Sequence, residues 1–307
     1  MPSLSPNLEV NIAGVAMKNP VAAASGTCGY GDVYAEFYHP AELGALVTKG
    51  ISLEPRLGNP TPRMAETPAG MLNAIGLENV GLKVFLNEKL PPLRDAGVTV
   101  VVNFFGNTED EYAWLAETLS SALGVAGLEA NISCPNVKAG GIEFGTRPEV
   151  AGKLVERIKA VCGKPLWVKL SPNVTDIAAV AKAVEQAGAD AICAINTLKG
   201  MAIDLDQRKP ILANVTGGLS GPAIKPVALR MVYEIAQAVK VPVVGVGGIT
   251  TAKDALEFIV AGASAIQVGT ASFVNPRAPI QIINGIKNWM RENSLERVQD
   301  IIGTLKV

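Results

Sequence analysis

Short apolar runs alternate along the chain with longer amphipathic stretches. The runs are continuous rather than alternating with polar residues, which is typical of strands that are buried on both faces. Eight such runs predict strands at Val21–Ala24, Ala45–Thr48, Val98–Val102, Leu128–Ile132, Leu166–Leu170, Ala191–Ile195, Val243–Val246 and Ala265–Val268. The stretches between them predict helices at Asn79–Leu90, Thr108–Leu123, Pro148–Val161, Asp176–Ala187, Pro222–Val239, Ala252–Ala261 and Pro276–Glu292.

Strand–helix alternation repeated eight times favours an α/β fold of the closed (β/α)8 TIM barrel type. An open doubly wound sheet is the alternative, but it would carry a GxGxxG motif after its first strand, and this sequence has none there. The segment Leu8–Met17 is expected to form an N-terminal hairpin that closes the barrel's N-terminal end. Because no linker, charge block or low-complexity tract divides the chain, we expect one domain over residues 1–307.

Long loops are expected at the active face after strands 2, 4 and 6. From Lys49 to Asn103 the chain runs 54 positions, and from Asn196 to Gly247 it runs 51. The first of these loops is rich in proline, which predicts an extended, stiff path. Loops of this kind shape substrate pocket walls or close over them.

Composition and charge narrow the function classes. The chain has 27 basic and 28 acidic residues and a net charge of −1, which does not favour nucleic acid or an anionic membrane as a partner. The start of the chain resembles no signal peptide, and no apolar run approaches the length of a membrane span. We therefore expect a cytoplasmic protein whose partner is a small molecule or another protein.

Polar and glycine residues follow the predicted strands, where a TIM barrel assembles its active site. They are Ser25, Lys49, Asn103, Asn131 with Cys134, Lys169, Asn196 with Thr197, Gly247 with Gly248, and Gly269 with Thr270. A single asparagine after a strand is more often a turn residue than a ligand contact. Several amides and two lysines that converge on one barrel mouth favour a functional site.

Glycine turns follow the seventh and eighth strands, in GVGGIT (245–250) and VGTAS (268–272). In TIM barrels the loops after these two strands often bind phosphate through backbone N–H groups, and glycine allows a close approach. Both segments are also compatible with plain tight turns. A third glycine segment, TGGLSGPAIKP (216–226), is placed to cover such a ligand.

The four cysteines are widely spaced and form no CxxC pair, so no metal or iron–sulfur site is expected in this chain. Cys134, in NISCPN, is a candidate base or nucleophile because it leaves the fourth strand among polar residues. A buried, inert loop cysteine is the alternative. The only histidine, His39, lies among no catalytic-looking groups, so the chemistry has to proceed without a histidine base.

Several motifs occur in order along the chain: TKG (48–50), GNPTPR (58–63), GMLNAIGLEN (70–79), NISCPN (131–136), VKLSPN (168–173), INT (195–197), GVGGI and VGTA. Together they resemble the class 1 dihydroorotate dehydrogenases over nearly the whole chain, and most of all the class 1B catalytic subunit. Class 2 members are less similar, because they carry a serine base and an N-terminal membrane-associating extension.

The resemblance implies oxidation of dihydroorotate in pyrimidine biosynthesis, with FMN as cofactor and Cys134 as the base that removes a proton. It implies that FMN is contacted by Ser25, Lys49, Gly50, Asn103, Asn131, Lys169, Ile195, Gly221, Gly247, Gly248, Gly269 and Thr270. It implies that the substrate is contacted by Lys49, Asn73, Ala74, Ile75, Gly76, Leu77, Asn131, Asn196 and Thr197.

Class 1B enzymes pass their electrons to NAD through a second subunit that carries FAD and a [2Fe-2S] cluster, and the resemblance implies a heterotetramer of two catalytic and two electron-transfer subunits. Three alternatives stay open: a dihydropyrimidine dehydrogenase-type flavoprotein, a class 1A enzyme that uses fumarate, and a non-redox lyase or phosphosugar-binding barrel. In a lyase, Lys169 would be a Schiff-base lysine.

Overall fold

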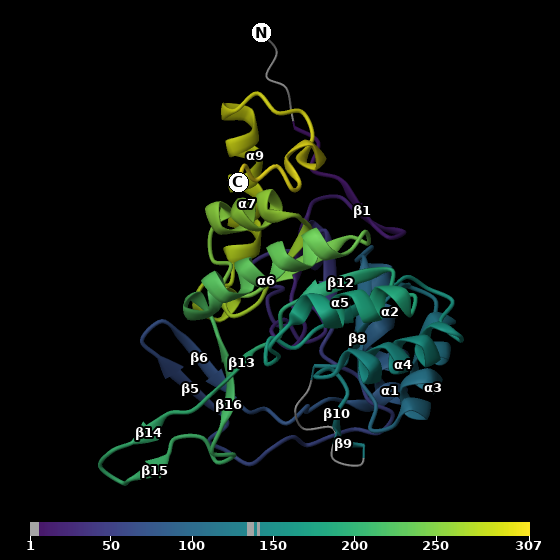
Figure 1. Cartoon of the computed structure of the whole chain (residues 1–307), viewed down its shortest axis with the longest axis vertical. Helices are drawn as coiled ribbons and strands as arrows, with labels where there is room; N and C mark the ends of the chain where they lie inside the picture. The colour runs from purple at the N-terminus through teal and green to yellow at the C-terminus, as the bar shows by residue number, and fades with distance from the viewer. Residues whose placement is uncertain (1–5, 134–137, 140–141) are drawn as a thin grey trace.

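The computed structural model describes residues 6–133, 138–139 and 142–307, and Figure 1 shows their arrangement. Eight parallel strands close into a barrel in the order β11-β12-β17-β18-β3-β4-β7-β8. Their bounds are β3 Val21–Ala23, β4 Ala45–Val47, β7 Val100–Phe104, β8 Val125–Asn131, β11 Leu166–Lys169, β12 Ala191–Ala194, β17 Val243–Val246 and β18 Ala263–Val268. The predicted (β/α)8 barrel is confirmed, and each predicted apolar run supplies one barrel strand.

Helices cover the outside of the barrel, with α3, α4 and α5 on one side and α6, α7 and α9 on another (Figure 1). Their bounds are α3 Glu109–Ser120, α4 Pro148–Lys159, α5 Ile177–Gln186, α6 Lys225–Ala238, α7 Ala252–Ala261, α8 Ala271–Val274 and α9 Ala278–Glu292. Single-turn 3₁₀ segments lie at η1 Pro40–Glu42, η3 Pro222–Ile224 and η4 Val298–Ile301. The helix starts follow their sequence signals, since the Thr108 side chain accepts a hydrogen bond from the Glu111 backbone and Thr251 forms a capping box with Asp254.

The helix that was expected at Asn79–Leu90 differs from the prediction. It begins at Gly81 as α1 (Gly81–Val84), widens into a π-helical turn, η2 (Phe85–Lys89), and continues as α2 (Leu90–Asp95). Pro91 and Pro92 follow the wide turn and lack backbone N–H groups. The π turn offsets the hydrogen-bond ladder at this point, so the chain remains helical through two prolines that would break a regular helix.

The N-terminal hairpin is present as β1 (Val10–Ile12) paired antiparallel with β2 (Val15–Met17). Ile12 and Val15 are buried, and Val15 packs beside Gly127 near the start of β8. Gly14 lies against Pro165, which directly precedes β11. The hairpin therefore covers the N-terminal ends of barrel strands, opposite the end where the active site of such a barrel lies.

The long loops after the second and sixth barrel strands pair with each other. Strands β5 (Met64–Thr67) and β6 (Gly70–Asn73) come from the first loop, and β13 (Leu198–Gly200) and β16 (Gly217–Ser220) from the second. They form one antiparallel sheet in the order β13-β16-β6-β5, which replaces the extended, stiff path expected for the first loop. A second hairpin, β14 (Ile203–Asp204) with β15 (Lys209–Pro210), projects beyond this sheet (Figure 1).

The loop after the fourth barrel strand contains a short antiparallel pair, β9 (Lys138–Ala139) with β10 (Ile142–Glu143). In the part of the chain that the structure describes, no helix is both long and apolar enough to cross a membrane.

Candidate active site

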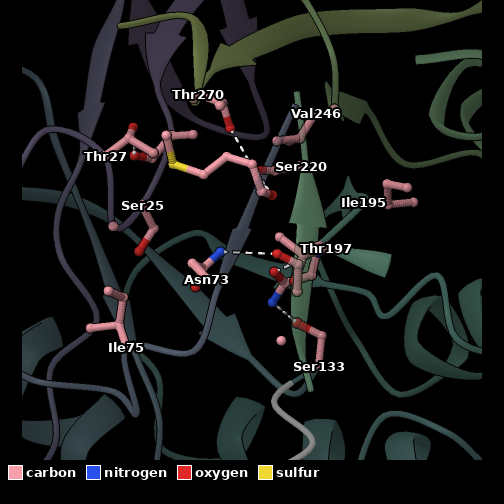
Figure 2. A pocket seen from close by; sticks show the side chains of 18 of the residues that line it. Ser25, Thr27, Asn73, Ile75, Ser133, Ile195, Thr197, Ser220, Val246 and Thr270 are labelled. Carbon is pink, nitrogen blue, oxygen red and sulfur yellow. Dashed lines mark hydrogen bonds between the residues drawn. The ribbon is translucent and has the colours of Figure 1, made fainter. Parts of the chain in front are cut away.

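A cavity of about 990 Å³ opens at the C-terminal ends of the barrel strands. Its walls combine strand-end residues with β6 and β16 of the four-stranded sheet, which from here on is called the cover sheet. Figure 2 shows side chains from these elements directed toward a common space. Its size and its mixture of apolar and convergent polar groups are typical of a small-molecule or cofactor site.

Every described residue that the sequence singled out for cofactor or substrate lines this cavity. These residues are Ser25, Lys49, Gly50, Asn73, Ala74, Ile75, Gly76, Leu77, Asn103, Asn131, Lys169, Ile195, Asn196, Thr197, Gly221, Gly247, Gly248, Gly269 and Thr270. Cys134 lies outside the described residues. Ser133, which directly precedes it, lines the cavity.

Lys169 ends β11 with only 7% of its side chain exposed. Its Nζ lies 3.9 Å from Oε1 of Glu129, which is fully buried on the neighbouring strand β8. The same carboxylate accepts hydrogen bonds from Asn103 Nδ2 at 2.7 Å and Gln267 Nε2 at 2.6 Å. The cation in the cavity wall is therefore part of a buried polar network.

Lys49 supplies the second cation, just beyond β4. Burial lowers the pKa of its ammonium group, the nearby carboxylate of Glu78 acts to raise it, and the charge of Arg63 lowers it further. Arg63 and Glu78 form an ion pair of their own. Among the described residues no carboxylate lies within ion-pair distance of Lys49, so its charge is available to an anionic ligand.

The Ser133 hydroxyl joins two of the predicted substrate amides. It donates to Asn131 Oδ1 at 2.7 Å and accepts from Asn196 Nδ2 at 2.6 Å. Asn196 Oδ1 in turn accepts from the Thr197 backbone N–H at 2.8 Å. These bonds fix both amide orientations, and within the described part of the chain the Nδ2 group of Asn131 is left as a hydrogen-bond donor for a ligand.

The glycine turn after β17 forms another part of the cavity wall. Gly248 has a φ of +72°, and a Cβ there would lie 2.7 Å from Lys225 at the start of α6. The next part of the turn is fixed by Asp254, whose Oδ2 accepts hydrogen bonds from the N–H and hydroxyl groups of Thr250 and Thr251 at 2.8–3.0 Å. Burial alone would raise the pKa of Asp254, but these bonds and the ion pair with Lys225 hold it well below its usual range.

The cover sheet touches the strand-end residues directly. A Cβ on Gly218 in β16 would lie 2.0 Å from Thr197 Oγ1, so only glycine fits there. Asn73 Nδ2 donates to the Gly218 carbonyl at 3.4 Å, and Thr270 Oγ1 donates to Ser220 Oγ at 2.8 Å. The two long loops and the barrel mouth thus form one enclosure.

Sequence reasoning missed Glu129, Ser133 and Gln267. Glu129 and Gln267 each interrupt an apolar run that was assigned to a buried strand. A charged or amide residue inside such a run is a usable signal, because it must find a partner inside the barrel. Ser133 lies between two residues that had been singled out, but serine after a strand gives no distinguishing signal.

The other three cysteines lie in settings that do not activate a thiol. Burial raises the pKa of Cys28 to about 11, and it raises that of Cys193 as well. Cys162 donates from Sγ to the Lys164 carbonyl at 3.2 Å. In the described ranges, no group of three or more histidine, cysteine, aspartate or glutamate side chains could hold a metal ion.

A closed barrel that carries two lysines, an amide chain and glycine turns around one enclosed cavity defines an α/β-barrel enzyme for a ligand with anionic groups. The family model for dihydroorotate dehydrogenase matches residues 7–290. The chain belongs to that family.

Curated relatives match over nearly the whole length. A protein of Pelobacter propionicus is 58% identical over 303 residues, which cover 99% of this chain and 100% of the relative. A protein of Geotalea uraniireducens is 58% identical over 300 residues and 98% of both chains. A protein of Geobacter sulfurreducens is 56% identical over 302 residues, covering 98% of this chain and 99% of the relative. All three are named dihydroorotate dehydrogenase B (NAD(+)), catalytic subunit.

Proposed function

We propose that this chain is the catalytic subunit of an NAD-linked dihydroorotate dehydrogenase, which oxidises dihydroorotate to orotate in pyrimidine biosynthesis. The observation that carries the proposal is one cavity at the barrel mouth, whose walls contain both the cofactor set and the substrate set expected from the family motifs. The names of the full-length relatives agree with this reaction.

The cavity residues fit FMN. Asn103 Oδ1 and Gln267 Oε1 are buried and have no hydrogen-bond partner among the described residues, so a ligand with N–H groups can satisfy oxygens in this wall. The turns at Gly247–Gly248 and Gly269–Thr270 line the same cavity, and the backbone N–H groups of such glycine turns suit a phosphate.

In this proposal Ser25, Lys49, Gly50, Asn103, Asn131, Lys169, Ile195 and Gly221 would hold the ring of FMN, and the two glycine turns its phosphate. Bound FMN would supply the acceptor for the hydride that leaves C6 of dihydroorotate. Lys169 would place positive charge where the reduced cofactor becomes negative. The protein's own contribution is therefore orientation and electrostatics.

The substrate set has matching chemistry. Dihydroorotate presents amide ring edges and a carboxylate, so amides that donate and accept suit the ring and a lysine suits the carboxylate. Asn73, Ala74, Ile75, Gly76, Leu77, Asn131, Asn196 and Thr197 would surround the ring, and Lys49 would pair with the carboxylate. The Ser133 hydroxyl bonds keep Asn131 and Asn196 in fixed orientations before the substrate arrives.

Cys134 would take the proton from C5 while the hydride leaves C6. Its support is positional: it follows Ser133, which lines the cavity between the two substrate amides. With no histidine other than His39 in the chain, a cysteine base is the consistent choice for the proton transfer.

The wider setting is part of the same proposal. Residues 1–307 would act as one FMN-binding domain in the cytoplasm. The relatives are each named as a catalytic subunit, which supports a separate electron-transfer subunit. That subunit would carry FAD and the [2Fe-2S] cluster and pass electrons to NAD in a heterotetramer with two copies of each chain.

Anaerobic mixing of the purified protein with dihydroorotate tests the reaction. We expect a yellow protein whose flavin absorbance at about 450 nm bleaches rapidly. A yellow protein that stays oxidised with dihydroorotate but bleaches with a dihydropyrimidine would move the assignment to the dihydropyrimidine dehydrogenase type. A colourless protein that binds no added FMN would contradict the flavin assignment and favour a non-redox barrel.

A further inference from the structure

A polar layer crosses the interior of the barrel next to the cavity. Its centre is Glu129, which lies on β8 two residues before Asn131 and is 0% exposed. In a TIM barrel, branched aliphatic side chains usually fill such an interior layer. Here a carboxylate occupies that position, together with Asn103 and Gln267, which are also 0% exposed.

The layer joins opposite walls of the barrel. In the closed strand order, β8 lies between β7 and β11 and is four strands away from β18 in either direction. Glu129 Oε1 accepts from Asn103 on β7, and Glu129 Oε2 accepts from Gln267 on β18. The ammonium group of Lys169 on β11 lies 3.9 Å from Oε1. One carboxylate thus contacts side chains from three other strands.

The three partners line the cavity, whereas Glu129 is not part of its lining. Burying a carboxylate and an ammonium together costs desolvation free energy, and a well-packed apolar layer of similar volume is often at least as stable. Stability alone therefore does not account for the arrangement. What Glu129 does provide is a fixed position for one cation and two amides at the wall that would face the flavin.

We propose that Glu129 is a positioning residue for the cofactor: it fixes Lys169, Asn103 and Gln267 at the cavity wall and offsets part of the Lys169 charge. This inference rests on the proposed function and deepens it. Because a reduced flavin carries more negative charge than an oxidised one, a carboxylate behind Lys169 weakens the preference of the cavity for the reduced state. Glu129 thereby keeps the reduction potential of the flavin lower than Lys169 alone would set it.

The decisive variant is Glu129→Gln, which keeps the size and planarity of the side chain. Its amide oxygen can accept from Asn103. Its amide nitrogen can donate to Gln267 Oε1 once the Gln267 amide flips, because Gln267 Nε2 faces the carboxylate in the unmodified protein. We expect the equilibrium constant for two-electron reduction of bound FMN to rise at least tenfold, a positive shift of roughly 30 mV or more. The measurement is an anaerobic spectrophotometric titration against a reference dye of known potential.

Two further variants separate charge from packing. Asp190→Asn is the matched control, since Asp190 also pairs with a lysine (Lys159 Nζ, 2.5 Å) but lies just before β12, at the N-terminal side of the barrel. It should leave the flavin potential unchanged. Glu129→Asp keeps the charge and is one methylene shorter, so it loses the bond across the barrel. We expect a potential close to that of the unmodified protein and about tenfold weaker FMN binding, the effect of one lost hydrogen bond.

The outcomes are distinguishable. An unchanged or lowered potential in Glu129→Gln, or an equal shift in Glu129→Asp, would overturn the charge-offset role. If Glu129→Gln does not fold, Glu129→Asp tests the positioning role. An FMN affinity of Glu129→Asp equal to that of the unmodified protein would overturn that role. If the unmodified protein binds no FMN, the proposed function itself is refuted. If dihydroorotate bleaches the flavin of the unmodified protein but Glu129→Gln has the same flavin potential, only the Glu129 inference is refuted.

Discussion

Lys49 and Lys169 both lie at the C-terminal ends of barrel strands and line the same cavity, yet their surroundings assign them different tasks. Lys169 is paired with the buried carboxylate of Glu129, which anchors its ammonium group. Lys49 has no such partner among the described residues, and burial lowers its pKa. A cation without a protein counter-ion is suited to a substrate carboxylate, and an anchored one is suited to a cofactor that stays bound.

The Lys49 environment predicts a pH dependence of ligand binding. Because the pKa of Lys49 is lowered, its charge is lost at a lower pH than that of an ordinary lysine, whose pKa is about 10.4. Orotate affinity, measured by titrating the flavin spectrum, should fall as the pH rises through that range. Lys49→Met should bind orotate about tenfold to hundredfold more weakly and lose this dependence.

Lys199→Met is the matched control for that experiment. Lys199 lines the same cavity but is exposed, so water screens its charge. If Lys199→Met weakened orotate binding as much as Lys49→Met did, a general effect of cavity charge would replace the specific pairing with Lys49.

Cys134→Ala should bind FMN and orotate normally but lose single-turnover flavin reduction by dihydroorotate about 10²- to 10⁴-fold, the usual contribution of a general base. Stopped-flow absorbance under anaerobic conditions measures this rate. Cys162→Ala is the control, because that thiol bonds the Lys164 backbone carbonyl and does not line the cavity. A Cys134→Ala rate equal to that of the unmodified protein would remove Cys134 from the mechanism.

At the scale of elements, the glycine turn after β17 depends on backbone conformation. Gly248→Ala adds a Cβ at a φ of +72° and brings it 2.7 Å from Lys225. Gly97 has a similar φ of +69° but has nothing within 4 Å of the Cβ position. Both substitutions cost about 1–2 kcal/mol of backbone strain, but only Gly248→Ala distorts the cavity wall.

We therefore expect Gly248→Ala to weaken FMN binding at least about tenfold, while Gly97→Ala lowers thermal stability and leaves FMN binding unchanged. Fluorescence titration of the apoprotein with FMN gives both dissociation constants. Equal FMN affinities in the two variants would show that the turn does not bind the phosphate.

The elements also differ in how well the sequence predicted them. Barrel strands are buried on both faces, so each leaves a continuous apolar run that can be recognised without any partner. The cover-sheet strands are short and partly exposed, and β16 consists of Gly-Gly-Leu-Ser. Nothing in such a segment indicates a strand until β6 pairs with it across the cavity mouth.

At the scale of the whole molecule, the proposal divides the reaction between two chains. The purified protein alone should reduce a small redox dye with dihydroorotate but give only background turnover with NAD. Addition of the electron-transfer subunit should restore NAD reduction, which is measured as a rise in NADH absorbance. Fast NAD reduction by this chain alone would contradict the need for a partner, and fast fumarate reduction instead would favour the class 1A alternative.

The sequence by itself determined the order of the barrel strands and many of the residues around the cavity. Burial on both faces leaves a local pattern, and a parallel barrel brings all its C-terminal strand ends to one mouth. That rule was enough to group residues as distant as Ser25 and Thr270.

Only the tertiary structure decided which of these groups touch. Glu129 and Gln267 are 138 positions apart and meet because barrel closure places their strands on opposite walls. Ser133 joins Asn131 to Asn196 across 63 positions, and β6 meets β16 over the mouth. Such contacts depend on closure, register and side-chain direction, which no local pattern in the sequence encodes.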